Sequence, residues 1–395
     1  MCKMMESNRV LYYLGAGASA NVIPAVKGLR PRILDLITYL KDYQFSQPLK
    51  KYFSGSDSDI AIKIKSDYSD TLDEVIDTLQ WLYDNSKSAH TIDVLAKELY
   101  TKESSDFIKL KKALIIYFYF EQACLFGSKS EGYDTIQSST IDTRYNHFIS
   151  QITRKEQGKE IVLKPNVKIC SWNYDVQFEL NLMRIVDAGI LRTKDYFQIY
   201  PNLKSINKDT IVDFSQDSFA MFKLNGTALP ESSYDIPENL LTAFDNLNDD
   251  GEYNLLNFLK YYKELYKDKN SSYTLRMFNF SFEEDDSYSP KYKGALAMME
   301  AAKSIMKYVD ILVIIGYSFP ESNSKIDKLL LDLIEPKQII IQDLNPESIS
   351  VKLFRRCPTL KKFVDNSGSN KDNPKVEINL NKDVETFYMP DDLLI

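Results

Sequence analysis

Five apolar residues run directly into a turn of small residues near the start of the chain: VLYYL at 10–14, followed by GAGASA at 15–20. A short apolar run that ends at glycine is typical of a buried strand followed by a tight turn. The chain holds only 13 glycines in 395 residues, so two of them in G-x-G spacing at a strand end form an informative pattern. The opening therefore predicts a buried strand whose carboxyl end carries a glycine-rich turn.

The same arrangement, an apolar run followed by polar or small residues, recurs along the chain. The runs and their endings are Val167–Cys170 with Ser171-Trp172-Asn173-Tyr174-Asp175, Phe219–Leu224 with Asn225-Gly226-Thr227, Ile311–Ile315 with Gly316-Tyr317-Ser318-Phe319-Pro320, and Gln338–Ile341 with Gln342-Asp343-Leu344-Asn345-Pro346. Helical patterns at 176–186 and 326–334 supply parallel crossovers between such strands. We predict an α/β fold, a Rossmann-like parallel sheet with helices on both faces, whose carboxyl edge binds a ligand.

Two stretches interrupt this pattern. Residues 45–160 read as a large helical insertion, with Leu72, Val75, Ile76 and Leu79 at helical spacing. Residues 230–295 read as a second insertion, rich in Asp and Asn around 245–253. The predicted core is therefore discontinuous, made of residues 1–44, 161–229 and 296–365, and residues 366–395 form a C-terminal tail.

Composition narrows the classes of function. The 49 Lys and Arg against 56 Asp and Glu give a net charge of −7, which leaves no basic excess for direct nucleic-acid binding. The four cysteines lie far apart, so no metal site or disulfide framework is expected. No signal peptide or membrane span is readable, which favours a cytoplasmic protein. His90 and His147 are the only histidines.

The turn at 15–20 also satisfies the spacing G-x-G-x-x-A, whose small residues let backbone N–H groups approach a pyrophosphate. A dehydrogenase would continue directly into a helix, whereas Asn21-Val22-Ile23-Pro24 interrupts it here. Hydride transfer is therefore disfavoured. The alternative that the motif is an ordinary tight turn stays open.

The order of these motifs along the chain resembles the sirtuin superfamily. The Asn-Tyr-Asp, Gly-Tyr-Ser-Phe and Asp-Leu-Asn-Pro elements are most similar to bacterial sirtuin-like proteins that deplete NAD in antiphage defence. The resemblance covers about residues 8–40, 165–228 and 300–350. The chain differs from deacylating sirtuins because it lacks their four-cysteine zinc module and has Ala25-Val26-Lys27 after Ile-Pro.

The resemblance implies a site for NAD, the substrate, with no metal. The implied cofactor-binding residues are Gly15, Ala16, Gly17, Ala18, Ser19, Ile23 and Pro24 around the pyrophosphate, Gly316, Tyr317 and Ser318 on the adenosine side, and Gln342 and Asp343 near the adenosine ribose. The implied catalytic residues are Asn173, Asp175 and Asn225. Asn225 occupies the position of the family's histidine base, so a mechanism that must deprotonate a ribose hydroxyl loses its base.

Hydrolysis of NAD depends less on that base, because an oxocarbenium-like ribose reacts readily with a water oriented by the Asn173 amide. Asn173 could instead simply cap the following helix, and His147 could replace the base. We expect an NAD glycohydrolase acting as an antiphage-defence effector, a homo-oligomer or partner of a HerA-type translocase ATPase. The alternatives are an inactive NAD- or ADP-ribose-binding subunit, a protein deacylase, and a purely structural assembly protein.

Overall fold

The computed structural model describes residues 8–24, 26–45, 63–64, 66–87, 91–123, 141–155, 161–186, 193–194, 196–202, 217–228, 255–256, 258–260, 262–263, 278–283, 295–368 and 374–394. The chain forms two compact units. The sheet unit comprises Met1–Ala20, Asp142–Thr227 and Tyr292–Ile395. The helical unit comprises Asn21–Ile141 and Ala228–Lys291.

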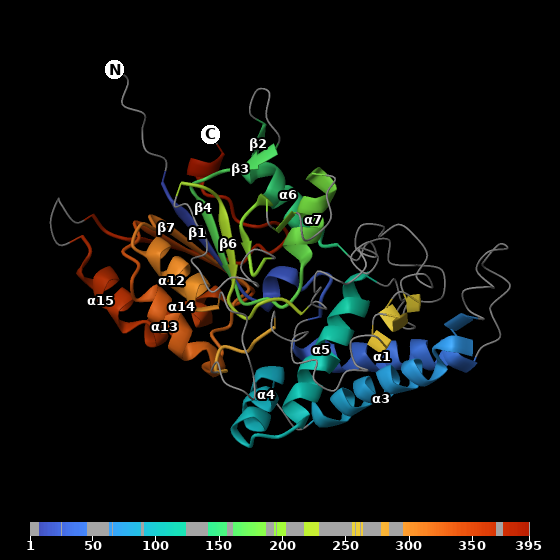
Figure 1. Ribbon diagram of the computed structural model, residues 1–395. Coiled ribbons are helices and arrows are strands. Elements are labelled where there is room, and N and C mark those ends of the chain that lie inside the picture. The colour runs from blue at the N-terminus through green and yellow to red at the C-terminus, as the bar shows by residue number, and fades with distance from the viewer. Residues whose placement is uncertain are drawn as a thin grey trace. The chain divides into compact units, whose positions relative to one another are not determined.

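Seven strands, all parallel, form the sheet of the first unit (Figure 1). Their order is β5 (Ile199–Tyr200), β6 (Ala220–Lys223), β4 (Val167–Ser171), β1 (Val10–Leu14), β7 (Ile311–Ile315), β8 (Gln338–Gln342) and β9 (Glu377–Asn381). The middle strand, β1, is buried along its whole length and pairs with β4 and β7. Near-continuous apolar runs are what a parallel sheet covered on both faces requires, so the predicted Rossmann-like fold is confirmed.

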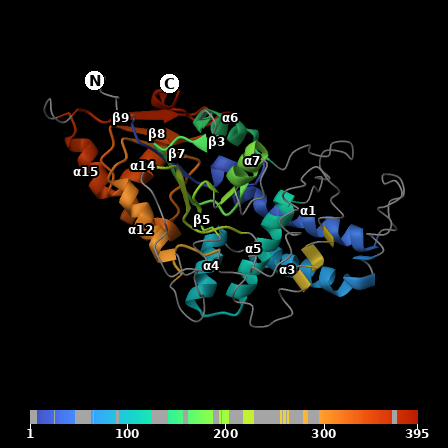
Figure 2. The ribbon, with the colours of Figure 1, turned by 45° about the horizontal axis from the view of Figure 1, so that its top comes forward.

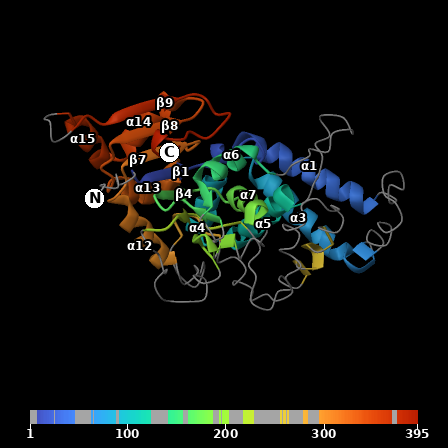
Figure 3. The same cartoon turned by 90° about the horizontal axis from the view of Figure 1, so that it is seen from above.

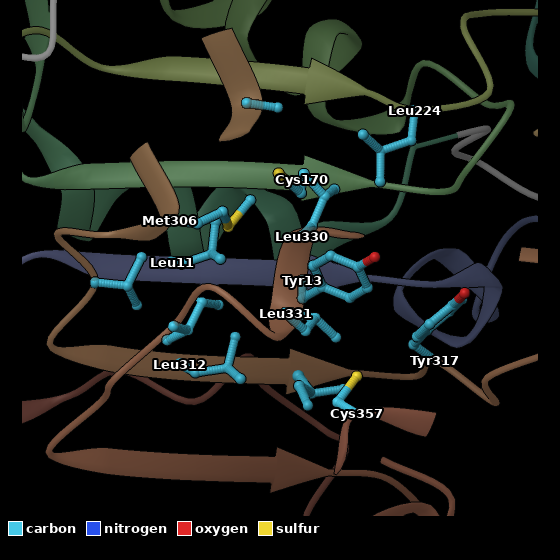
Figure 4. Close-up of a cluster of buried hydrophobic side chains, with 14 of the residues drawn as sticks. Leu11, Tyr13, Cys170, Leu224, Met306, Leu312, Tyr317, Leu330, Leu331 and Cys357 are labelled. Carbon is cyan, nitrogen blue, oxygen red and sulfur yellow. The ribbon is translucent and has the colours of Figure 1, made fainter. Parts of the chain in front are cut away.

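One face of the sheet is covered by four helices: α12 (Ala295–Met306), α13 (Ser324–Leu331), α14 (Pro346–Arg356) and α15 (Pro358–Asn366). Alternate residues of β1 point to this face, and Figure 4 shows Leu11 and Tyr13 among side chains from the neighbouring strands and α13. Each fully buried large apolar side chain in this cluster contributes roughly 1.5–3 kcal/mol.

The other face is covered by α6 (Thr143–Ile152) and α7 (Gln177–Val186), which lie beside each other (Figure 3). The Tyr12 ring of β1 meets the Phe148 ring of α6 edge-on, with 4.7 Å between their centroids. Figure 2 shows β9 at the edge of the sheet, next to β8.

The predicted boundaries differ from those of the structure. Helix α6 was expected in the helical insertion, but it buries Phe148 and Ile152 against the sheet and so belongs to the sheet unit. The two strands that follow it, β2 (Thr153–Lys155) and β3 (Ile161–Leu163), form a small antiparallel pair, so the stretch to residue 160 is not wholly helical.

The helical unit contains α1 (Val26–Phe45), α3 (Ser69–Asn85), α4 (Ile92–Thr101) and α5 (Asp106–Ala123). Arg32 of α1 pairs with the buried Glu121 of α5 at 2.8 Å, so α1 belongs with the insertion rather than with the predicted core. Lys111 of α5 pairs with Glu283 at 2.9 Å, so the two predicted insertions form one unit. No helix in the described ranges is long and apolar enough to span a bilayer.

Candidate functional site

The candidate site lies at the carboxyl edge of the sheet. The chain builds β4, β5 and β6 on one side of β1 and then returns to its other side to form β7, β8 and β9. Such a reversal of direction is the topological switch point of an open parallel sheet, outside which ligands bind. The turns that follow β1, β4, β6 and β7 all reach this edge, which is where the sequence predicts the polar residues.

Asn173 follows β4 and is 5% exposed. Its side-chain Nδ2 donates to Ser19 Oγ at 3.2 Å, and its backbone N–H donates to Ser171 Oγ at 3.1 Å. Its carbonyl oxygen Oδ1 is buried and has no hydrogen-bond partner among the residues that the structure describes. A buried acceptor without a partner costs roughly 1–3 kcal/mol, so this oxygen is suited to accept a bond from a ligand hydroxyl or a water.

Tyr145 of α6 also lies in the candidate site, although its local sequence does not indicate this. Its hydroxyl lies 3.1 Å from Ser19 Oγ, the atom that Asn173 also contacts. Burial raises the pKa of Tyr145 well above its usual value, so the phenol stays protonated. His147, the alternative candidate for a base, is exposed two residues further on, about 200° around the helix. His90 lies outside the described residues.

Helix α6 also holds the glycine turn in place. Arg144 Nη2 donates to the Ala18 carbonyl at 3.0 Å and pairs with Asp142 at 2.6 Å. Asp142 caps the helix by accepting from the Arg144 backbone N–H at 3.0 Å. The sheet unit therefore needs α6 to fix the position of Ser19.

Asp175 is buried near Ser19 at the start of α7. The backbone N–H of Gln177 donates to its Oδ1 at 3.0 Å. Burial raises the pKa of Asp175, while the Lys223 ammonium, the Gln177 N–H and the Ser19 hydroxyl partly offset this rise. Lys223 of β6 pairs with Glu179 of α7 at 3.0 Å and donates to the backbone carbonyl of Asp175, so a buried ion pair lies next to the site.

Asn225 follows β6 and is 2% exposed. Its Nδ2 donates to the Trp172 carbonyl at 3.4 Å, which places it beside the residue that precedes Asn173. Its Oδ1 is also buried and unpartnered within the described part of the chain. The structure thus brings together the three predicted catalytic residues and Ser19 from the ends of β1, β4 and β6.

The glycines of the G-x-G turn are explained by packing between two turns. The Gly17 N–H donates to the Gly316 carbonyl at 2.9 Å. A Cβ at Gly15 would lie 2.6 Å from Gly316 O, and one at Gly17 would lie 2.7 Å from Gly316 Cα. Gly316 itself has φ +58. Because the Gly17 N–H is already engaged, a pyrophosphate would have to bind other groups, and the motif carries less weight than Asn173.

The residues predicted on the adenosine side have varied surroundings. Tyr317 is buried and donates to Asp327, whereas Ser318 is exposed. Gln342 is committed to the C-terminal segment, because its Nε2 donates to Asp383 O and Thr386 O and its Oε1 accepts from Tyr388 N.

Asp343 stands at the end of β8, where its Oδ1 accepts from the Asn345 backbone N–H at 2.9 Å. Ile23 and Pro24 belong to the helical unit, and Ala16 is exposed, two residues before the buried Ala18.

A small surface hollow lined by Arg9 and Lys168 lies at the opposite, amino-terminal edge of the sheet, so it is not part of this site.

No three His, Cys, Asp or Glu side chains converge as metal ligands in the part of the chain that the structure describes. The arrangement offers instead two buried amides, a hydroxyl pair and a buried carboxyl group. No protein-family model matches this sequence, and no curated protein is detectably similar to it.

Proposed function

We propose that the chain is an NAD glycohydrolase that cleaves NAD to nicotinamide and ADP-ribose. The observation that carries the proposal is the buried Oδ1 of Asn173, which has no partner within the described ranges and lies beside Ser19 at the switch point of a parallel sheet. The resemblance of the same strand-end motifs to sirtuin-like proteins supports NAD as the substrate.

The chemistry suits a site without a strong base. The bond between ribose C1′ and the pyridinium nitrogen breaks with its electron pair going to nicotinamide, which leaves as a neutral molecule. The ribose carries an oxocarbenium-like charge, and water attacks C1′ and then loses a proton to solvent. Asn173 Oδ1 accepts a hydrogen bond from that water and orients it, and Ser19 and Tyr145 fix the amide.

Asp175 serves the leaving group in this proposal. Its carboxyl group accepts a hydrogen bond from the nicotinamide amide, and in its ionised form it also favours the developing positive charge. Burial raises the pKa of this group, and Lys223 and the Gln177 N–H partly offset that rise. Asn225 contributes a second buried amide oxygen, suited to accept from a ribose hydroxyl.

The proposal is tested by nicotinamide release from NAD with Asn173→Ala, beside Asn181→Ala as a matched control. Asn181 is also a fully buried asparagine whose Oδ1 has no partner among the residues that the structure places, but it lies on α7, where its Nδ2 donates to Gln177 O at 2.7 Å. We expect release to fall by about 100-fold or more in Asn173→Ala, and to follow the folded fraction alone in the control. Equal rates per folded molecule in the two variants would contradict the assigned role.

A binding-only subunit is the second candidate, and Asn225 in place of a histidine favours it. Saturable NAD binding without nicotinamide release, unchanged by protein concentration, would support this candidate over the enzyme. A deacylase would instead form O-acyl-ADP-ribose from an acyl-lysine peptide.

The antiphage role and the HerA-type partner rest on the resemblance. The antiphage role is tested by phage challenge of cells that express the chain or Asn173→Ala. We expect NAD to fall during infection in cells with the unchanged chain and to be retained with the variant.

A further inference from the structure

The two edges of the seven-stranded sheet differ in how they are protected. At one edge β5 has only two residues, both buried, and Pro201 follows without a backbone N–H. At the other edge β9 has five residues and, among the described strands, pairs with β8 alone. Ile378 and Leu380 of β9 are 41% and 40% exposed. Proteins usually protect a free edge with proline, charged side chains or a bulge. β9 itself contains no proline, lysine or bulge. Its one charged residue is Glu377, and Pro374, Lys375 and Lys382 lie just outside it.

The backbone of β9 directs its groups inward and outward at defined positions. The Glu377 N–H donates to Lys337 O at 3.0 Å, and the Asn381 carbonyl accepts from Asp343 N at 3.1 Å. Residues 377, 379 and 381 therefore point their backbone groups toward β8. Because these groups alternate along a strand, Ile378 and Leu380 direct their N–H and C=O groups outward.

We propose that β9 pairs with β9 of a second copy of this chain, antiparallel about a two-fold axis through Asn379. Ile378 of one copy then lies opposite Leu380 of the other, and each such pair exchanges two backbone hydrogen bonds. The pairing joins the two sheets into one of fourteen strands, a size that open sheets in large α/β proteins reach.

The chemistry of the segment favours a copy of itself as the occupant. Read against itself in the opposite direction, the sequence KVEINLNKD at 375–383 sets Lys375 opposite Asp383, Val376 opposite Lys382, Glu377 opposite Asn381, and isoleucine opposite leucine. This register thus pairs apolar side chains at its centre and opposite charges, Lys375 and Asp383, at its ends.

Neighbouring registers fit less well. An axis through Leu380 would set Glu377 opposite Asp383, a like-charge pair. An axis through Ile378 would require a hydrogen bond from Pro374, which has no N–H. The register centred on Asn379 avoids both faults.

The oligomeric state is the first test, measured by sedimentation of the full chain over a range of concentrations. We expect about twice the chain mass of 45.7 kDa for the unchanged protein, and at least a tenfold weaker association for Leu380→Lys. Val94→Lys is the control, because Val94 is 51% exposed on α4. A monomer at every concentration, or a dimer unaffected by Leu380→Lys, would overturn the proposal.

The register is tested by disulfide trapping in a background with Cys2→Ser and Cys124→Ser. Two cysteines introduced by Asn379→Cys would face each other as a non-hydrogen-bonded pair with Cα atoms about 4.5 Å apart, within disulfide range. With Asn381→Cys they would lie about 14 Å apart along the strands. We expect a covalent dimer with Asn379→Cys alone. Its absence, or equal trapping at both positions, would overturn the register. Neither test depends on NAD cleavage.

Discussion

The Asp327 carboxylate, fully buried on α13, connects three strand ends. It accepts from the hydroxyls of Tyr13 at 2.7 Å and Tyr317 at 2.9 Å, and pairs with Arg356 of α14 at 3.0 Å. The Trp172 Nε1 donates in turn to the Tyr13 hydroxyl at 3.0 Å. The residues before Asn173 and after β7 are therefore fixed through one buried carboxylate.

This carboxylate gives the sheet unit a defined pH dependence. Burial raises the pKa of Asp327 from 3.8 to about 6, although its tyrosine and arginine partners oppose the rise. Between these values the unfolded chain loses a proton that the folded chain keeps, so stability falls as the pH rises from 4 to 7. The gap between the two pKa values corresponds to a loss of ~3 kcal/mol in the free energy of unfolding. Urea unfolding should show this decline relative to Asp327→Asn, and parallel pH profiles for the two proteins would contradict it.

At this scale the sequence indicates some residues of the candidate site and gives no sign of others. Asn173 and Asp175 could be found because they directly follow an apolar strand. Tyr145 could not, because it precedes Asn173 by 28 positions and reads locally as part of an amphipathic helix. The surroundings of Gln342 depend on Asp383, Thr386 and Tyr388, which the fold brings to it from the end of the chain.

Among the elements, the turns after β1 and β7 form one interlocked structure. A Cβ at Gly316 would lie 2.5 Å from the Cα of Gly17, at a left-handed φ of +58. Gly368 has a similar φ of +77, but a Cβ there would meet the Lys375 Cβ at 3.1 Å. Alanine would therefore be strained by the left-handed backbone at either position. Only at Gly316 would its Cβ also clash with the backbone of another turn.

We predict that Gly316→Ala lowers the free energy of unfolding by roughly 1–3 kcal/mol more than Gly368→Ala. Chemical denaturation of the two variants measures the difference. Equal losses would mean that the two turns can separate without cost.

The sequence predicts an element well when the pattern that marks it lies within the element's own residues. The strands β1, β4, β7 and β8 were found within a residue or two, because fully buried parallel strands are continuous apolar runs. The edge strand β5 has only two residues and gives no such run. Helix α6 was assigned to the wrong unit, because an amphipathic pattern identifies a buried face without identifying what it packs against.

The molecule contains two compact units, the sheet unit and the helical unit, each with its own buried side chains. Leu79 of α3 and Leu312 of β7 are both fully buried, one in each unit. Truncating either to alanine should destabilise its own unit by about 2–5 kcal/mol. Hydrogen exchange should then speed up in α3 and α5 for Leu79→Ala, and in β1 and β7 for Leu312→Ala. Loss of protection in both units together would show that they unfold as one.

The most direct test of the proposed activity is the release of nicotinamide from NAD by the purified full chain, followed by chromatography. Protein concentrations should span the association expected of β9, so that both monomer and dimer are sampled. The proposal predicts equimolar nicotinamide and ADP-ribose from the unchanged protein, and loss of both products with Asn173→Ala. Protein that binds NAD but releases no nicotinamide at any concentration would contradict it.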